Sequence, residues 1–63
     1  MNWKKINENQ YINIEHTDLI VINSLQEKYE VKFKLNNDSV YYSNPFNTLE
    51  EAEKFLDKIL ERK

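Results

Sequence analysis

The sequence contains no glycine and no cysteine among its 63 residues. Phosphate-cradling loops and dinucleotide-binding turns need glycine for close approach of the backbone to the ligand, so both kinds of site are excluded. Without cysteine there is neither a disulfide framework nor a thiolate metal site, and a single histidine excludes a histidine-rich metal site. We therefore expect neither a cofactor nor a metal. Tight turns should be made by Asn and Asp, the other residues that tolerate left-handed backbone.

The chain is also short and carries little net charge. Sixty-three residues allow one domain, spanning 1–63, and a domain of this size buries only roughly 60% of its unfolded surface. Its stability should therefore be marginal, and self-association is the remaining aid that the composition permits. The net charge of −2 argues against a nucleic-acid or anionic-membrane partner. No apolar run follows the first lysines, so we expect no signal peptide, no membrane span and a cytoplasmic location.

Residues 48–63 predict an amphipathic helix. Thr48 is a good N-cap, and Glu51 three residues later completes a capping box. Arg62 and Lys63 should complement the helix dipole at the other end. The predicted buried face consists of Leu49, Ala52, Phe55, Leu56, Ile59 and Leu60. A candidate binding surface, the acidic helix flank, consists of Glu50, Glu53, Asp57 and Glu61. The competing interpretation of this flank is an ordinary solvated surface with ion-pair support between residues four apart.

The N-terminal segment predicts two short strands. The polar residues 7–10 form a turn signal, and Ile12 and Ile14 after it share one face. We expect Trp3 to pack into the core, since small cores recruit large hydrophobic side chains, and the alternative is a binding role. His16 should be an exposed loop residue. Asp18 lies two positions on, but no serine or cysteine nucleophile accompanies the two in a recognisable setting.

Residues 29–35 predict the clearest strand, because apolar and charged side chains alternate along it. If Asn37-Asp38 is a two-residue hairpin loop, Leu35 pairs with Val40 and Phe33 with Tyr42 on the inner face. Lys32, Lys34 and Tyr41 then lie on the outer face.

Residues 19–22 are apolar throughout, so a strand here carries apolar side chains on both faces of the sheet. An even-length turn near residues 25–28 pairs Ile22 with Val31 and Ile20 with Phe33 on the inner face. Leu19 and Val21 must then point outward with the lysines. Either another strand or the N-terminal segment covers them, or they belong to an interface. The second candidate surface therefore consists of Leu19, Val21, Lys32, Lys34 and Tyr41.

The fold class follows from the order of these segments. Pro45 cannot donate to a ladder and ends the sheet, and Phe46 should plug the space between sheet and helix. We predict an α+β fold in which an antiparallel meander of four to five strands is covered on one face by a single C-terminal helix. The segments that define it are W-K-K-I-N (3–7), Y-I-N-I (11–14), L-I-V-I (19–22), Y-E-V-K-F-K-L (29–35) and F-N-T-L-E-E-A-E-K-F-L (46–56).

This pattern resembles a loose class of short bacterial and phage proteins that have such a meander and one C-terminal helix. The resemblance rests on core positions, turns and a helix cap, so it implies a fold and transfers no catalytic residue. One departure is visible, since such proteins commonly place glycine in the central hairpin, where this chain has Asn37-Asp38.

For function, an enzyme is the weakest hypothesis. A nucleophile in a catalytic setting and paired metal ligands are lacking, and the carboxylates Glu50 and Glu53 lie on a solvated helix face with no apolar pocket. We expect a non-catalytic protein-interaction module. Its short length and the residue usage typical of AT-rich coding DNA indicate a phage or mobile element, whose small proteins often bind and inhibit a host defence protein.

Two further hypotheses concern the same surfaces. Self-association through the outer sheet face or the sheet edge would offset the thin core. The alternative from another class is single-stranded nucleic-acid binding, in which Lys32, Lys34, Tyr41 and Tyr11 would form a stacking platform.

Overall fold

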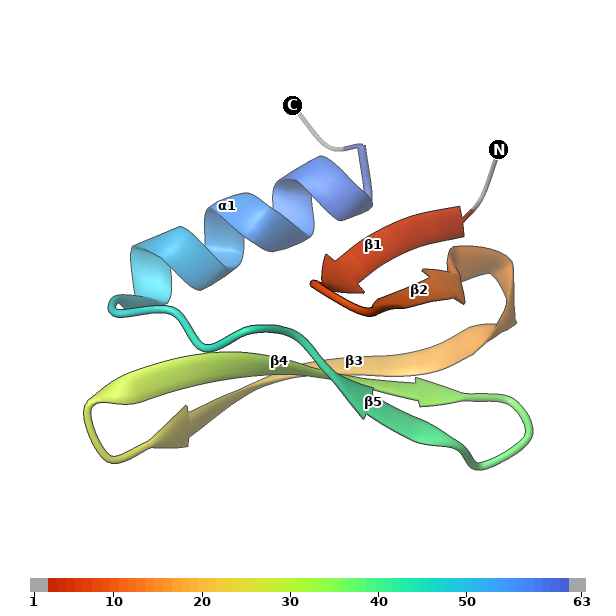
Figure 1. The fold of residues 1–63 in the computed structure, drawn as a ribbon, viewed down its shortest axis with the longest axis horizontal. Helices are drawn as coiled ribbons and strands as arrows, with labels where there is room; N and C mark the ends of the chain where they lie inside the picture. Colours follow the sequence, from red (N-terminus) through yellow and green to blue (C-terminus); the bar gives the residue numbers. More distant parts are fainter. Residues whose placement is uncertain (1–2, 62–63) are drawn as a thin grey trace.

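The computed structural model describes residues 3–61 and contains two antiparallel sheets and one helix (Figure 1). The elements are β1 (Trp3–Asn7), β2 (Gln10–Asn13), a 3₁₀ turn (Ile14–His16), β3 (Thr17–Leu25), β4 (Lys28–Leu35), β5 (Val40–Tyr42) and α1 (Leu49–Ile59). β1 pairs with β2, and a second sheet has the order β3-β4-β5. The α+β class and the C-terminal helix are confirmed, whereas the strands form two sheets and not one meander. No helix among these residues is long and apolar enough to cross a membrane.

The 3₁₀ turn explains why the meander divides. The side chain of Asn13 accepts a hydrogen bond from the backbone N–H of Glu15 at 3.0 Å, and this caps the turn. The hydroxyl of Thr17 donates to the carbonyl of Asn13 at 3.3 Å. These bonds hold the chain in a tight reversal between β2 and β3, so the β1–β2 hairpin leaves the plane of the second sheet.

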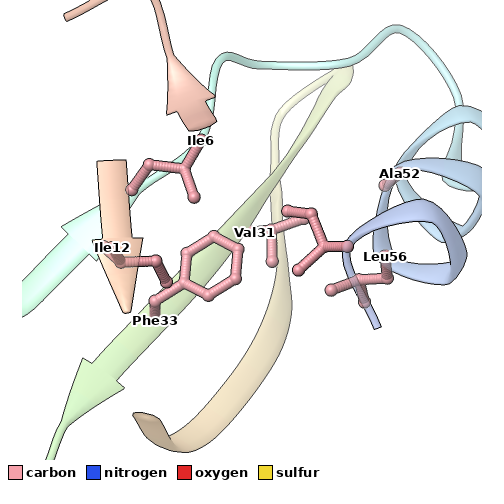
Figure 2. Close-up of a cluster of buried hydrophobic side chains, with 7 residues drawn as sticks. Ile6, Ile12, Val31, Phe33, Ala52 and Leu56 are labelled. Atoms are coloured by element: carbon pink, nitrogen blue, oxygen red, sulfur yellow. The ribbon is translucent and has the colours of Figure 1, made fainter. Parts of the chain in front are cut away.

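The hairpin and α1 lie side by side on the same face of the three-stranded sheet (Figure 1). Between the two layers lies the core, in which Ile6 and Ile12 of the hairpin approach Phe33 of β4, while α1 packs on Val31 (Figure 2). Lys4 of β1 also donates to Glu61 at the end of α1, with Nζ and Oε1 3.1 Å apart. The helix was predicted to cover this face alone, but it shares the face with the hairpin.

The start of α1 is as predicted. The Thr48 hydroxyl accepts from the backbone N–H of Glu51 at 3.1 Å, and the Glu51 carboxylate accepts from the N–H of Thr48 at 3.2 Å. The buried face is narrower than predicted and is formed by Ala52, Leu56 and Ile59, with Phe55 partly buried. Leu49 and Leu60 are exposed. The predicted contributions of Arg62 and Lys63 lie outside the described residues.

Phe46 lies between sheet and helix, as predicted. Its ring centroid is 5.1 Å from that of Phe55 on α1, and its backbone exchanges two hydrogen bonds with Tyr29 of β4 at 2.6 and 2.9 Å. Phe55 in turn meets Phe33 edge-on at 6.4 Å. A chain of aromatic contacts therefore joins the β5–α1 connection, the helix and the centre of the sheet.

The register between β3 and β4 is also as predicted. Ile20 pairs with Phe33 and Ile22 with Val31, and the turn between the strands has two residues, Gln26 and Glu27. Because the loop length is even, the inner-face residues of both strands match.

The predicted register between β4 and β5 is wrong by one residue. Phe33 pairs with Tyr41, not with Tyr42, because the loop has three residues and not two. The carbonyl of Leu35 accepts from the N–H of Asp38 at 3.0 Å, and the N–H of Leu35 donates to Ser39 at 2.8 Å. Asp38 takes a left-handed conformation with φ of 70°, which is the turn-plus-bulge geometry of three-residue hairpin loops. The extra residue reverses the facing of every β5 side chain.

Candidate protein-binding face

The outer side of the three-stranded sheet carries two rows of side chains that run across all three strands. Residues opposite each other in an antiparallel sheet share a face, with Cβ atoms about 5 Å apart. In the order β3, β4, β5, the rows are Leu19–Lys34–Val40 and Val21–Lys32–Tyr42. We call these six residues the outer sheet face. Each row has a lysine at its centre and an apolar side chain on either side.

The apolar side chains of this face are uncovered. Leu19 is 49% exposed, Val21 37%, Val40 40% and Tyr42 42%. The hairpin, which was one of the segments predicted to cover them, lies on the inner face (Figure 1). Single exposed apolar side chains are ordinary on a protein surface, but adjacent ones that form a patch mark an interaction site. Of the two predicted alternatives, cover or interface, the described residues supply no cover.

The composition of the face differs from the prediction at β5. Tyr41, which was predicted to lie outside, pairs with Phe33 and packs against the core from the inner side. Val40 and Tyr42 take its place on the outer sheet face. The signal that would have found them is the loop sequence Asn36-Asn37-Asp38, since Asp tolerates the left-handed position that a three-residue loop requires.

The two lysines give the face a positive centre. Lys34 Nζ lies 3.7 Å from Asp38 Oδ1, in a pair whose side chains are 44% and 88% exposed. Lys32 has no carboxylate within salt-bridge distance among residues 3–61. Lysine stems lie along apolar neighbours while the ammonium group stays in water. The face therefore combines apolar area with two cationic groups, while Glu30 lies on the same side of β4, two residues before Lys32.

The acidic helix flank does not join this face. α1 lies on the inner side of the sheet, and flank residues are engaged within the chain. Glu50 lies 3.7 Å from Lys54, and Glu61 lies 3.1 Å from Lys4. The structure therefore separates the two predicted surfaces: Leu19, Val21, Lys32 and Lys34 come together, whereas Glu50, Glu53, Asp57 and Glu61 lie elsewhere.

A hollow of about 420 Å³ lies between the β1–β2 hairpin and the loop end of the β4–β5 hairpin. Trp3, Tyr11 and Tyr41 line it together with His16, and no carboxylate, lysine or arginine of residues 3–61 does. The prediction that Trp3 packs into the core is wrong, since the side chain is 58% exposed and Ile6 and Ile12 fill the core from the hairpin. His16 is exposed as predicted, with Nδ1 3.4 Å from Asn36 Nδ2.

One other predicted arrangement, the stacking platform, is not assembled in the part of the chain that the structure describes. Tyr11 and Tyr41 lie at the hollow, on the inner side, whereas Lys32 and Lys34 lie outside, so the predicted stacking platform is divided. Within residues 3–61, no three His, Asp or Glu side chains are placed to hold a metal ion.

Comparison with protein-family models gave no match, and neither did comparison with curated proteins or with solved structures.

Proposed function

We propose that this protein is a small, non-catalytic protein-interaction module that binds a partner through the outer sheet face. The observation that carries the proposal is the set of four exposed apolar side chains in two adjacent rows around Lys32 and Lys34. Burial of apolar area drives association at roughly 25 cal/mol per Å², so an uncovered patch in a small domain is the surface from which a partner gains most.

The charge of the face indicates the chemistry of the partner. A second copy packed face to face would bring the central lysines of both copies together, and like charges at an interface oppose binding. A different protein that presents an apolar surface with carboxylates opposite Lys32 and Lys34 would gain both from burial of apolar area and from ion pairing with the lysines. We therefore propose a heterologous protein partner with an apolar, acidic surface.

The biological setting that we propose is a phage or mobile element, with the protein acting in the cytoplasm by binding and inhibiting a host defence protein. The short chain and the residue usage of AT-rich coding DNA support this setting, and the absence of cysteine fits a reducing compartment.

The test compares three baits in pull-downs from the native host, followed by affinity measurements with the purified partner. The baits are the wild type, a face variant Lys32→Glu/Lys34→Glu, and a helix control Lys54→Glu/Lys58→Glu with the same change of net charge. We expect the wild type and the helix control to bind the same protein, and the face variant to bind it at least tenfold more weakly. Affinity for the wild type should also fall as salt is raised.

Equal binding of the partner by all three baits would assign the interaction to another surface. Binding of labelled single-stranded oligonucleotides at low salt, lost at high salt, would instead assign the outer sheet face to nucleic acid.

A further inference from the structure

The two edges of the three-stranded sheet differ in how they are covered. β5, at one edge, has three residues, and the hairpin reaches it. The Asn7 side chain donates to the carbonyl of Tyr42 at 2.9 Å, and the N–H of Asn44 donates to the carbonyl of Ile6 at 3.4 Å. β3, at the other edge, has nine residues and is the longest strand. One edge is therefore short and bonded in part to the hairpin, and the other is long.

The hydrogen bonds of β4 show which backbone groups of β3 are free. Tyr29, Val31 and Leu35 bond toward the β5 side, to Phe46, Ser43 and Ser39. Bonding alternates along an antiparallel strand, so the even-numbered residues of β4 bond to the odd-numbered residues of β3. The N–H and C=O groups of Ile20, Ile22 and Ser24 consequently point away from the sheet. No hydrogen bond within residues 3–61 reaches them from another element.

This edge lacks the features that usually prevent strand pairing. Proteins protect edges with proline, charged side chains, bulges or short strands. Residues 19–25 contain neither proline nor a charged residue, and the bulge of β3 lies before them, between Thr17 and Leu19. The segment is thus a regular strand with free donors and acceptors.

From these features we infer that β3 pairs antiparallel with β3 of a second copy, so that two three-stranded sheets join into one of six strands. A twofold axis at Ile22 places Ile22 opposite Ile22 of the second copy and Ile20 opposite the second copy's Ser24. These are the residues whose backbone groups are free, as a hydrogen-bonded pairing requires. On the outer side, Leu19 then lies opposite the second copy's Leu25.

A second copy suits this edge for reasons of charge and area. The paired segments are uncharged, so the twofold arrangement brings no like charges together. Leu19 and Leu25, which are 49% and 53% exposed in the single chain, cover each other across the new strand pair. A domain in which residues 3–61 supply seven buried core side chains gains buried apolar area by this route. The inference does not depend on the partner proposed for the outer sheet face.

Sedimentation and light scattering across a concentration series test the pairing with two substitutions at one position. Ser24→Pro removes an outward N–H and blocks approach to the edge, whereas Ser24→Ala keeps the N–H. We expect twice the 7.7 kDa chain mass for the wild type and for Ser24→Ala, and the single mass for Ser24→Pro with an unchanged circular dichroism spectrum. A wild type that stays at the single mass at every concentration, or a folded Ser24→Pro that keeps the double mass, would overturn the inference.

Cross-linking provides a second readout if Ser24→Pro does not fold. The chain has no cysteine, so introduced thiols are the only ones present. Non-hydrogen-bonded pairs have Cα atoms about 4.5 Å apart, within disulfide range. Oxidised Leu19→Cys/Leu25→Cys should form a covalent dimer in native buffer and not in denaturant, while Leu25→Cys alone should stay largely monomeric. No cross-link in the double variant would contradict the pairing.

The face variant Lys32→Glu/Lys34→Glu should keep the double mass, which separates this result from that of the partner test.

Discussion

At the scale of single residues, Ser43 joins two strands where the β ladder ends. It is 5% exposed, and its hydroxyl accepts from the N–H of Val31 at 2.9 Å and donates to the carbonyl of Asn44 at 3.0 Å. Its own N–H donates to the carbonyl of Val31 at 2.9 Å. Both backbone groups of the fully buried Val31 are therefore satisfied by one serine. This lets the chain leave the sheet before Pro45 without an unpaired buried donor.

Ser43→Ala should lower the free energy of unfolding by about 1–3 kcal/mol, because it leaves the buried N–H of Val31 without an acceptor. Urea unfolding followed by circular dichroism measures the change. Ser24→Ala, at an exposed position, is the matched control and should change the stability by less than about 0.5 kcal/mol. Equal stabilities of the two variants would show that the Ser43 hydroxyl is not needed by Val31.

Backbone conformation at three residues shows the consequence of a chain without glycine. Gln26, Asp38 and Glu61 have positive φ values of 54°, 70° and 57°. Of these three residues, Asp38 is the one whose type was predicted for left-handed backbone. Gln26 lies in the β3–β4 turn, and Glu61 follows the C-cap of α1, a position where glycine is common.

At the scale of elements, the β3–β4 hairpin is therefore built with a strained turn. Gln26→Gly should raise the free energy of unfolding by about 1 kcal/mol, because glycine takes a positive φ without the Cβ clash. Gln26→Ala keeps the Cβ and should give no gain. The same urea titration compares the two, and a glycine variant no more stable than the alanine variant would indicate that the turn is not strained at this residue.

The start of the helix and the facing of the β4 side chains depend least on the rest of the molecule. The reciprocal hydrogen bonds of Thr48 and Glu51 form within four residues of chain, and the alternation of residues 29–35 places Lys32 and Lys34 outside whatever the neighbours are. β5 is different, since Val40, Tyr41 and Tyr42 offer an apolar side chain to either face.

At the scale of the whole molecule, stability depends on one small core between two layers. Phe33 is fully buried at its centre and packs with the hairpin side chains (Figure 2). It also contacts Phe55 of α1. A domain of this length has a total stability of about 3–9 kcal/mol. One large core side chain therefore accounts for much of the total.

Phe33→Ala should lower the free energy of unfolding by about 3–5 kcal/mol and leave a large fraction of the chain unfolded at 37 °C. Thermal unfolding at one fixed protein concentration measures this, since pairing of two chains would make the midpoint depend on concentration. Val21→Ala, on the outer sheet face, should cost about 1 kcal/mol or less. If Phe33→Ala unfolds cooperatively with a thermal midpoint close to that of the wild type, Phe33 is not at the centre of the core.

The sequence by itself determined the elements whose signals are local. These are the cap and start of α1, the outward facing of Lys32 and Lys34, and the parity that sends Leu19 and Val21 to the same side. Each depends on residues close in the chain or on an even loop length, so no distant contact is needed to decide it.

Only the tertiary structure decided the position of the N-terminal hairpin and the facing of β5. The hairpin places Ile6 and Ile12 in the core on the inner face and leaves Trp3 exposed, and these contacts join residues far apart in the chain, which no local pattern contains. Val40 and Tyr42 lie outside because a three-residue loop and the bonds of Ser43 to Val31 set the register, while the apolar run of β5 is compatible with either face. That register completes the outer sheet face. The β1–β2 hairpin bonds to Tyr42 at the β5 edge, while β3 at the other edge has no strand beside it among residues 3–61.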